Sequence, residues 1–249
     1  MRSSANPVFR RIEKNCPEQL SDVKLASFKG VAIKSLILIM IAITAGIAAP
    51  FIFTAIPGAL IPVAIAAGLG SFIIVLIGMM SVKMAPAMGI LYSLVQGLFL
   101  GAVTAILDPI VYENFGFSNL GMSALIGVGA IFGIMFALYY FGIIKVTNRL
   151  RGILIGSLLA VFVVSLVIMI TGATTTMFNN PGLAIAFSVL MIVLGAFFLT
   201  LDFNRAAQLV EMGAPAAYEW QVALGLMVTL VWLYVEILRL IIILVSRNR

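Results

Sequence analysis

Carboxylates are the scarcest chemically active groups in this chain. Only nine Asp and Glu occur among 249 residues, of which 63% are hydrophobic. Glu236 lies inside the last long apolar run, where a carboxylate costs ~2.5–3.5 kcal/mol on membrane-insertion scales and is a functional candidate by default. A functional role for Glu236 requires a second carboxylate, and Asp202 at the end of the preceding apolar run supplies one. Two carboxyl groups within hydrogen-bonding reach in an apolar bundle share a proton, so the pair has the chemistry of a pH switch.

Each acid also has a purely structural explanation. Glu236 is followed three residues later by Arg239, which lies on the same helical face and near enough to the helix end to extend toward the headgroups. Asp202 stands where the sixth apolar run gives way to a polar stretch, with Arg205 three residues further on. The residues alone leave both interpretations open: a sensing pair, or two local ion pairs.

The last apolar run has one polar side. Steps of three or four residues place a set of polar and small residues on one helical face: Gln221, Gly225, Thr229, Trp232, Glu236, Arg239 and Ser246. The opposite side is aliphatic and is expected to face lipid or to pack outward: Val228, Val231, Val235, Leu238 and Ile242. We expect this helix to lie at the centre of the bundle. Thr229, Trp232, Arg239 and Arg205 are candidates for supporting the carboxylate pair.

Composition predicts an all-α integral membrane protein with seven transmembrane helices. Charged residues make up 10% of the chain, against ~25% in soluble domains, and the apolar runs are unbroken rather than alternating as in a β-barrel. A crossing takes roughly 20 helical residues. The seven predicted helices are residues 31–49, 58–80, 87–107, 121–144, 152–171, 181–201 and 220–245. Residues 31–249 thus form the transmembrane domain, and residues 1–30 form an N-terminal tail without a signal peptide.

Local signals set some helix boundaries. Pro50 and Pro57 bracket the first turn. Asn180 followed by Pro181 predicts the start of the sixth helix, because Asn is a capping residue and Pro suits the first helical position. Three Gly-xxx-Gly pairs, which let helices approach closely, indicate a tightly packed bundle: Gly97/Gly101, Gly129/Gly133 and Gly152/Gly156.

We predict a cell-membrane protein, and the distribution of Lys and Arg predicts that its N-terminus is cytoplasmic. Positive residues are enriched on the cytoplasmic side of membrane proteins, and here they fall in the tail and in the second, fourth and sixth loops: Lys83, Lys145, Arg149, Arg151 and Arg205. The other loops have none, and Asp108 and Glu113 fall outside. Seven crossings leave Arg247 and Arg249 outside, against the rule, so a re-entrant last segment is the alternative.

Composition also excludes several classes of site. The chain has no histidine, which rules out a Ser-His-Asp triad, a His-ligated haem and a His-based zinc site. Cys16 has no partner for an internal disulfide and is expected to be a thiol in a reducing cytoplasm. The basic residues form no stripe for nucleic acid. An intramembrane aspartyl protease needs two aspartates, and one candidate here is Glu236. We expect neither an enzyme nor a resident cofactor.

The chain resembles the Bax inhibitor (transmembrane Bax inhibitor motif) family over essentially its whole length. The resemblance rests on Leu201-Asp202-Phe203 and on Leu233-Tyr234-Val235-Glu236-Ile237-Leu238. The segments Asn6-Pro7-Val8-Phe9 and Gly213-Ala214-Pro215 to Tyr218-Glu219-Trp220 are similar to the bacterial branch. The resemblance implies seven helices with the last one central and a bacterial inner-membrane location. It also implies an acidic pair on helices six and seven that senses pH and gates a calcium leak.

Carried over by position, the sensing pair is Asp202 and Glu236, which would also contact the permeant calcium. Many relatives have Asp where this chain has Glu236, which moves the carboxylate about one methylene outward. Many also have an acidic residue in the third helix where this chain has Gln96. A neutral amide can coordinate a cation through its carbonyl, or it can hydrogen-bond a neighbouring helix.

The implied switch has two possible directions. A carboxyl–carboxylate hydrogen bond between Asp202 and Glu236 would tie helices six and seven together and close the pore, and deprotonation would expose oxygen ligands to calcium. The reverse, a protonated open state, is equally compatible with the residues. Two other functions stay open. One is a membrane-embedded modulator of a membrane protease or other membrane protein, docked through residues 1–30, and the other is a proton-coupled transporter.

Overall fold

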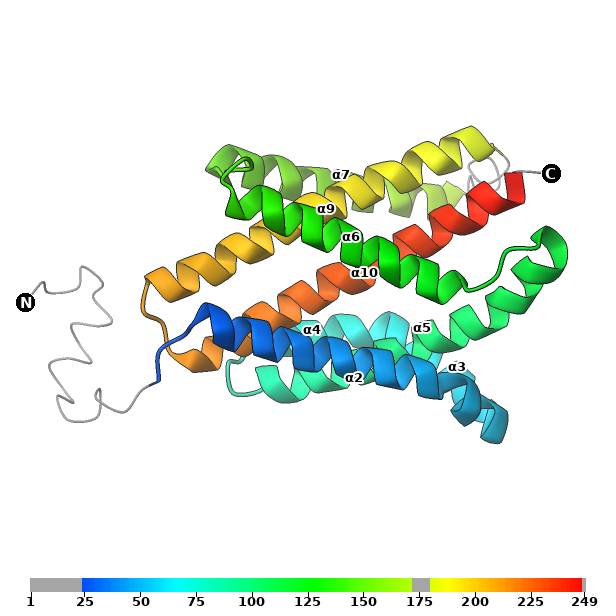
Figure 1. Ribbon diagram of the computed structural model, residues 1–249, viewed down its shortest axis with the longest axis horizontal. Coiled ribbons are helices and arrows are strands. Elements are labelled where there is room, and N and C mark those ends of the chain that lie inside the picture. Colours follow the sequence, from blue (N-terminus) through cyan, green and yellow to red (C-terminus); the bar gives the residue numbers. More distant parts are fainter. Residues whose placement is uncertain (1–23, 172–179, 248–249) are drawn as a thin grey trace, which may run out of the picture.

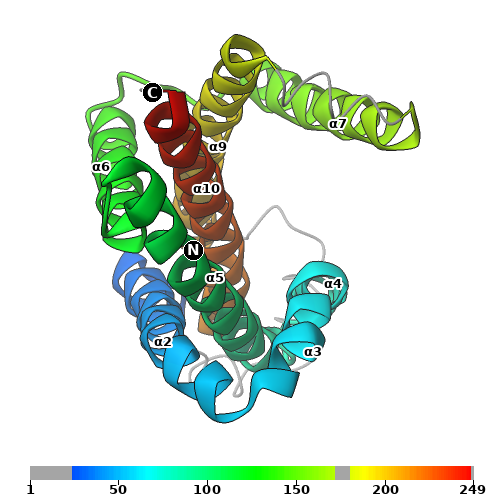
Figure 2. The ribbon, with the colours of Figure 1, turned by 90° about the vertical axis from the view of Figure 1, so that its right-hand side faces the viewer.

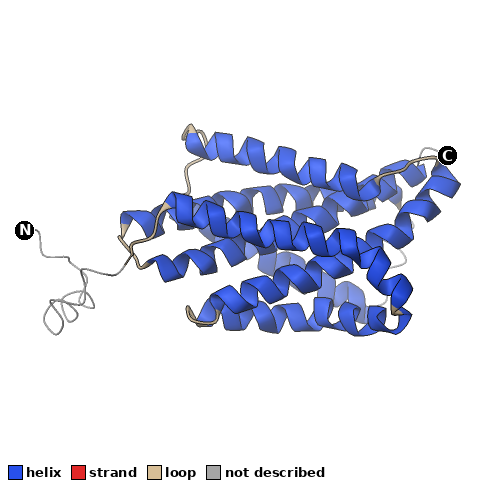
Figure 3. Ribbon diagram, turned by 60° about the horizontal axis from the view of Figure 1, so that its bottom comes forward, coloured by secondary structure: helices blue, strands red, loops and turns tan. Residues whose placement is uncertain are grey.

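The computed structural model describes residues 24–171 and 180–247, in which helices run along the long axis of the molecule and are joined at its two ends (Figure 1, Figure 3). Apart from helices and turns, the described backbone has one isolated β-bridge, between Leu25 and Pro215. Within these residues, seven segments are long and apolar enough to cross a bilayer. They are α2 (Phe28–Ala55), α3 with α4 (Leu60–Ile65 and Ser71–Met80), α5 (Ala85–Phe115), α6 (Leu120–Tyr140), α7 (Asn148–Thr171), α9 (Pro181–Glu211) and α10 (Glu219–Arg247). The predicted all-α, seven-helix membrane fold is confirmed.

The first helix is longer than predicted. It begins at Phe28, where the hydroxyl of Ser27 accepts the N–H of Gly30 at 3.0 Å. It then continues through Pro50 to Ala55, so the expectation that Pro50 ends it is wrong. Proline is tolerated inside membrane helices where the surroundings compensate for the missing N–H. Here the affected turn is the one at Gly46, which packs directly against α5.

The second crossing, predicted as one continuous helix, consists of three pieces in the structure. A π-helical turn, Ala66–Gly70, separates α3 from α4. This turn contains Gly68 and Gly70, the residue type that weakens a helix most after proline. A π-turn leaves backbone carbonyls off the regular helical pattern, so they need partners from a neighbouring helix.

The sixth predicted helix, α9, starts at the predicted residue but ends later. The side-chain oxygen of Asn180 accepts the N–H groups of Gly182 and Leu183 at 3.1 and 3.4 Å, which confirms Asn180 as the cap. The expected end at residue 201 is wrong, because residues 203–211 contain neither Pro nor Gly and the helix continues to Glu211. The chain turns at Gly213, whose φ is 60°. Asp202 therefore lies inside a helix rather than at its end.

The last helix, α10, occupies the centre of the bundle as predicted. It packs against α9, α2, α5, α6 and α4, whereas α7 lies at the periphery and packs on α9 (Figure 2). Because α5 and α6 enclose the aliphatic side of α10, Leu238 is buried against Val111 and Ala124. The expectation that Leu238 faces outward is therefore wrong, while Val235 is 41% exposed as expected.

The three Gly-xxx-Gly pairs differ in their surroundings. At Gly97 and Gly101 an added Cβ would overlap the backbone of Ala42 and Gly46, so this pair lets α5 approach α2 closely. The other two pairs, Gly129/Gly133 and Gly152/Gly156, have no atom of the described chain near the position a Cβ would take. Only the first pair therefore marks a helix contact within the described chain.

The ends of the bundle match the predicted alternation of loops. The α4–α5, α6–α7 and α9–α10 turns lie at the end where α2 begins, and α10 runs without a break to the other end (Figure 1). Lys83 and Lys145 lie in two of these turns. A re-entrant last segment is not what the structure contains, since α10 is continuous over Glu219–Arg247.

Candidate functional site

Asp202 lies in the middle of the contact between α9 and α10. It is 4% exposed, and its Oδ2 accepts a hydrogen bond from the hydroxyl of Thr229 at 2.6 Å. Its Oδ1 lies 3.4 Å from Nη1 of Arg205, which is one turn further along α9. Gly225 of α10 lies beside the carboxylate, and a Cβ there would make an ordinary contact of 3.7 Å with Oδ1. A buried charge is tolerated when it is paired and hydrogen-bonded, and Asp202 is both.

Glu236 lies further along α10 and is 6% exposed. Its Oε2 is 2.5 Å from Nη2 of Arg239. The same guanidinium donates from Nε to the hydroxyl of Ser188 on α9 at 3.1 Å, and it lies 5.3 Å from the ring centre of Phe187. Arg239 therefore connects the acid on α10 to the neighbouring helix. Trp232 shares this side of α10, and its ring lies 5.6 Å from that of Phe198 on α9.

The two carboxylates do not meet in this structure. Asp202 binds α10 at Thr229, and Glu236 is seven residues further along, which corresponds to about 10 Å of helix rise. Leu199 and Leu233, both fully buried, belong to the apolar cluster that occupies this part of the α9–α10 contact. The structure contains both local ion pairs, with Arg205 and with Arg239, and no hydrogen bond between the two carboxyl groups is among the contacts of the described chain.

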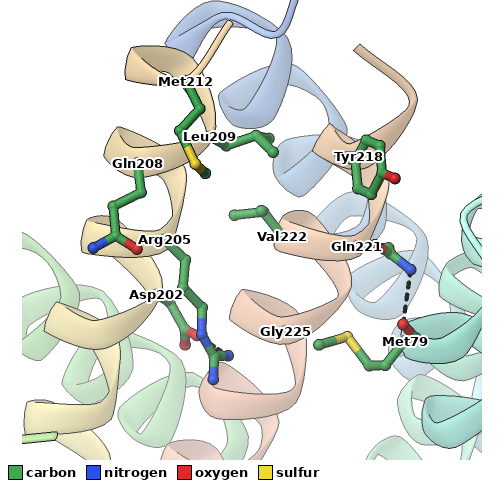
Figure 4. Close-up of a pocket in the computed structure, with 10 residues that line it drawn as sticks. All are labelled: Met79, Asp202, Arg205, Gln208, Leu209, Met212, Tyr218, Gln221, Val222 and Gly225. Carbon is green, nitrogen blue, oxygen red and sulfur yellow. Dashed lines mark hydrogen bonds and ion pairs between the residues drawn. The ribbon is translucent and has the colours of Figure 1, made fainter. Parts of the chain in front are cut away.

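A pocket of about 230 Å³ opens beside Asp202 at the end where α9 and α10 are connected (Figure 4). Arg205 and Gln208 line it from α9, and Gly225 lines it from α10. The amide of Gln221 donates to the carbonyl of Met79 at 2.8 Å, which ties α10 to the end of α4. The side chain of Arg205 is 46% exposed. Asp202 thus lies at the base of a pocket, whereas Glu236 lies two helical turns deeper.

The side chain of Gln96 on α5 hydrogen-bonds to the neighbouring π-turn. Its Nε2 donates to the carbonyl of Ala67 at 3.0 Å and to the hydroxyl of Ser71 at 2.8 Å. Of the two interpretations of Gln96, the structure contains the interhelical hydrogen bond. The nitrogen of the amide makes these bonds, so in this conformation the residue acts as a donor to a helix rather than as a cation ligand.

One charged cluster was missed by the sequence analysis. Glu219 at the start of α10 is 2% exposed; its Oε2 lies 2.6 Å from Nζ of Lys34 on α2, and its Oε1 accepts the N–H of Ser27 at 2.7 Å. Lys34 also donates to the carbonyl of Ala216 at 2.8 Å and lies 5.5 Å from the ring of Trp220. The signal was available, because ionisable residues within membrane-spanning segments are rare and usually paired, and Lys34 lies inside the first apolar run. Its partner, 185 residues away, was not predictable from spacing.

Candidate metal ligands are dispersed. Within residues 24–171 and 180–247 no three Asp, Glu or Cys side chains lie together as a metal site. Asp202 and Glu236 each offer one carboxylate at a separate level, and a calcium ion at either would have to complete its six to eight oxygen ligands from hydroxyls, carbonyls and water. Cys16 and most of the predicted tail, residues 1–23, lie outside the described residues.

Comparison with known proteins identifies the family of this chain. Neither the curated proteins nor the solved structures contain a match to it. The sequence profile described as "Bax inhibitor 1 like" matches residues 6–246, which is nearly the whole chain and includes all seven helices and both carboxylates. The protein is therefore a multi-pass membrane protein that belongs to the Bax inhibitor 1-like family.

Proposed function

We propose that this protein is a pH-sensitive calcium leak channel in which Asp202 and Glu236 form the sensor and the gate. The observation that supports this most is the placement of two buried carboxylates at successive levels of the α9–α10 contact, with a pocket leading to the first of them. Calcium is the permeant ion in this proposal rather than a resident cofactor, and no covalent chemistry is involved. Family membership supports the proposal independently.

The geometry favours opening by proton uptake, the second of the two directions left open by the sequence. Each carboxylate holds an arginine by charge, and Arg239 in turn holds Ser188 of α9. A proton on Glu236 removes the charge that holds Arg239, and a proton on Asp202 does the same for Arg205. A neutral Asp202 also accepts a weaker hydrogen bond from Thr229 of α10, so the α9–α10 contact loses support at both levels. Separation at Leu199 and Leu233 would open the apolar layer between the two acids.

Calcium flux from liposomes containing the purified protein, measured between about pH 5 and about pH 8, tests this proposal. Asp202→Asn and Glu236→Gln each remove one titrating group at nearly constant shape, so each is expected to abolish the pH dependence of flux. The double variant should add little, because in this proposal the loss of either charge already releases the α9–α10 contact. Glu236→Asp keeps the charge and should retain a pH response with a shifted midpoint. Glu113→Gln, an exposed acid on α5, is the matched control and should behave as the unmodified protein.

Two results would contradict the proposal. If Asp202→Asn and Glu236→Gln both leak with the unmodified pH profile, the carboxylates are not the sensor and the two ion pairs are structural. If flux saturates and requires a co-substrate, the protein is a proton-coupled transporter that uses the same acids.

A modulator of another membrane protein, docked through the N-terminal tail, is favoured by one observation. The last part of the tail pairs with the α9–α10 turn: the N–H of Ala26 donates to the carbonyl of Ala214 at 2.8 Å, and the N–H of Ala216 donates to the carbonyl of Lys24 at 2.8 Å. A partner bound to the tail would therefore pull on the turn that joins the two acid-bearing helices. Under this alternative, deletion of residues 1–23 should abolish the effect on the partner membrane protein. Under the channel proposal, the same deletion should leave the calcium leak from liposomes unchanged.

A further inference from the structure

A second and larger cleft lies in the opposite half of the bundle from the Asp202 pocket. Its volume is about 440 Å³, within the range of small-molecule sites in proteins. The helices α2 and α6 form its two sides, and α5 and α10 form its floor. The helices α2 and α6 pack on α5 and α10 but not closely on each other (Figure 2). The cleft therefore lies open between α2 and α6.

The cleft is apolar along most of its length. Its walls include Ile43, Ile47, Leu100, Leu125 and Val231. Water has no partners along such walls, while a hydrocarbon chain gains dispersion contacts on every side. An opening at this depth of a membrane protein meets lipid chains, so the chemistry of the walls favours an acyl chain as the occupant.

Polar groups occur at one end of the cleft, near the α5–α6 turn. The hydroxyls of Thr104 and Tyr234 lie 3.0 Å apart and bond to each other, and Thr104 also donates to the carbonyl of Leu100 at 2.7 Å. Asp108, one turn further along α5, lines the same end. The cleft therefore has the shape of an amphiphile site, with a long apolar part and a short polar mouth.

Asp108 gives the mouth a negative charge without a protein cation. Its Oδ1 accepts the N–H of Leu120, the first residue of α6, at 2.9 Å. The three ion pairs of the described residues all lie elsewhere. The described turns at this end of the bundle, within residues 56–59 and 116–119, carry no Lys or Arg, and Arg247 at the end of α10 does not line the cleft. A cationic headgroup would supply the missing charge.

We propose that this cleft binds a membrane lipid with a primary-amine headgroup, its acyl chain lying between α2 and α6 and its ammonium group on the carboxylate of Asp108. An ammonium has three N–H donors for a carboxylate, whereas a trimethylammonium headgroup has none. Discrimination between the two headgroups thus follows from hydrogen bonding and not from charge alone. The site is independent of the proposed channel function, because neither Asp202 nor Glu236 lines it.

Native mass spectrometry of the purified protein, in an equimolar mixture of phosphatidylethanolamine and phosphatidylcholine with identical chains, tests the proposal. The protein should retain the ethanolamine lipid in about tenfold excess, the size of effect that one hydrogen bond between charged groups supplies. Asp108→Asn keeps the oxygen that accepts the N–H of Leu120 but loses the charge, so total lipid occupancy should persist while the excess falls to near unity. Glu113→Gln, which removes an acid from the same helix outside the cleft, is the matched control and should keep the excess.

Ala105→Phe tests the chain-binding part separately, because Ala105 lines the cleft and a larger side chain fills it. This variant should lose both lipids while its thermal stability stays close to that of the unmodified protein. The proposal is overturned if the unmodified protein retains the two lipids equally, if Asp108→Asn keeps the full preference, or if Ala105→Phe leaves occupancy unchanged. Asp108→Glu, which keeps the charge, must retain the preference, and its loss there also overturns the proposal.

Discussion

The two acids of the α9–α10 contact are held in the same way. Each carboxylate has an arginine three residues later on its own helix, and each arrangement also reaches the neighbouring helix, through Thr229 in one case and Ser188 in the other. The local arginine is present before the helices pack, so it lowers the cost of placing the acid in the bilayer. The hydroxyl contact forms only on packing. It therefore sets the register of α9 against α10.

The first prediction concerns the hydroxyl that holds Asp202. Thr229→Val preserves the shape of the side chain but leaves Oδ2 of the buried carboxylate without its donor, which should lower the free energy of unfolding by about 1–3 kcal/mol. Thr229→Ser keeps the donor and should lie close to the unmodified protein. Thermal unfolding in detergent, followed by size-exclusion fluorescence, measures both. Equal stability of the two variants would show that the hydrogen bond does not hold Asp202.

The second prediction concerns the arginine beside Glu236. Arg239→Gln leaves a buried carboxylate without its cation, a change that costs about 3–5 kcal/mol in other proteins. Adding Glu236→Gln removes the unpaired charge, so the double variant should recover most of that loss. Arg149→Gln, at an exposed position of α7, should change stability by no more than about 0.5 kcal/mol. A double variant as unstable as Arg239→Gln alone would argue against a structural ion pair.

At the scale of elements, run length predicted the number of crossings but not where each helix ends. Each crossing must span the same hydrocarbon thickness, so seven apolar runs give seven helices. Pro50 was a poor guide because it lies inside a helix whose neighbours tolerate a missing N–H. The π-turn at Ala66–Gly70 was also not predictable, since it depends on Gln96 from another helix. Asn180 worked as a signal because capping is local.

In the candidate site, too, contacts within one helix were predictable from the sequence and contacts between helices were not. The ion pairs of Asp202 with Arg205 and of Glu236 with Arg239 follow from a spacing of three residues, which the sequence displays. The contact of Asp202 with Thr229 depends on how α9 slides against α10, and no local pattern encodes that. For the same reason the sequence could not show that the two acids occupy levels two turns apart.

The third prediction concerns the contact between α2 and the start of α10. Lys34→Met leaves Glu219 buried without its cation and should destabilise the protein by about 3–5 kcal/mol. Glu219→Gln alone removes the charge partner of Lys34, and the double variant should be more stable than the sum of the two losses predicts. Lys29→Met, an exposed lysine of the same helix, is the matched control. Thermal unfolding of the four proteins measures the coupling, and strict additivity would show that the pair is not coupled.

At the scale of the whole molecule, the two ends of the bundle are built differently. At one end α2, α4 and α10 are joined by Lys34 with Glu219 and by Gln221 with Met79, and the segment before α2 pairs with the α9–α10 turn. In the other half α2 and α6 are separated by the larger cleft. The two cavities lie in different halves, with the buried cluster of Leu199, Leu230 and Leu233 in the bundle interior. Under the proposed channel function we expect this arrangement to be the closed conformation, and we expect opening to require movement of α9 against α10.

The fourth prediction concerns the orientation of the bundle. A cysteine replaces Ile143, Ser118 or Ser246, one at a time, in a protein in which Cys16, the only cysteine, is Ser. Positive loops stay in the cytoplasm, so a membrane-impermeant maleimide added to intact cells should label Ser118→Cys and leave Ile143→Cys unlabelled until the cells are opened. Ser246→Cys should be labelled in intact cells, because α10 is unbroken from Glu219 to Arg247 and ends opposite the start of α2 (Figure 1). If only Ile143→Cys is labelled in intact cells, the orientation is the reverse of the one predicted. If Ser118→Cys is labelled but Ser246→Cys is protected, α10 does not cross the membrane. The second result would also remove Glu236 from the interior of the bilayer, and with it the energetic argument for the gating role proposed for this residue.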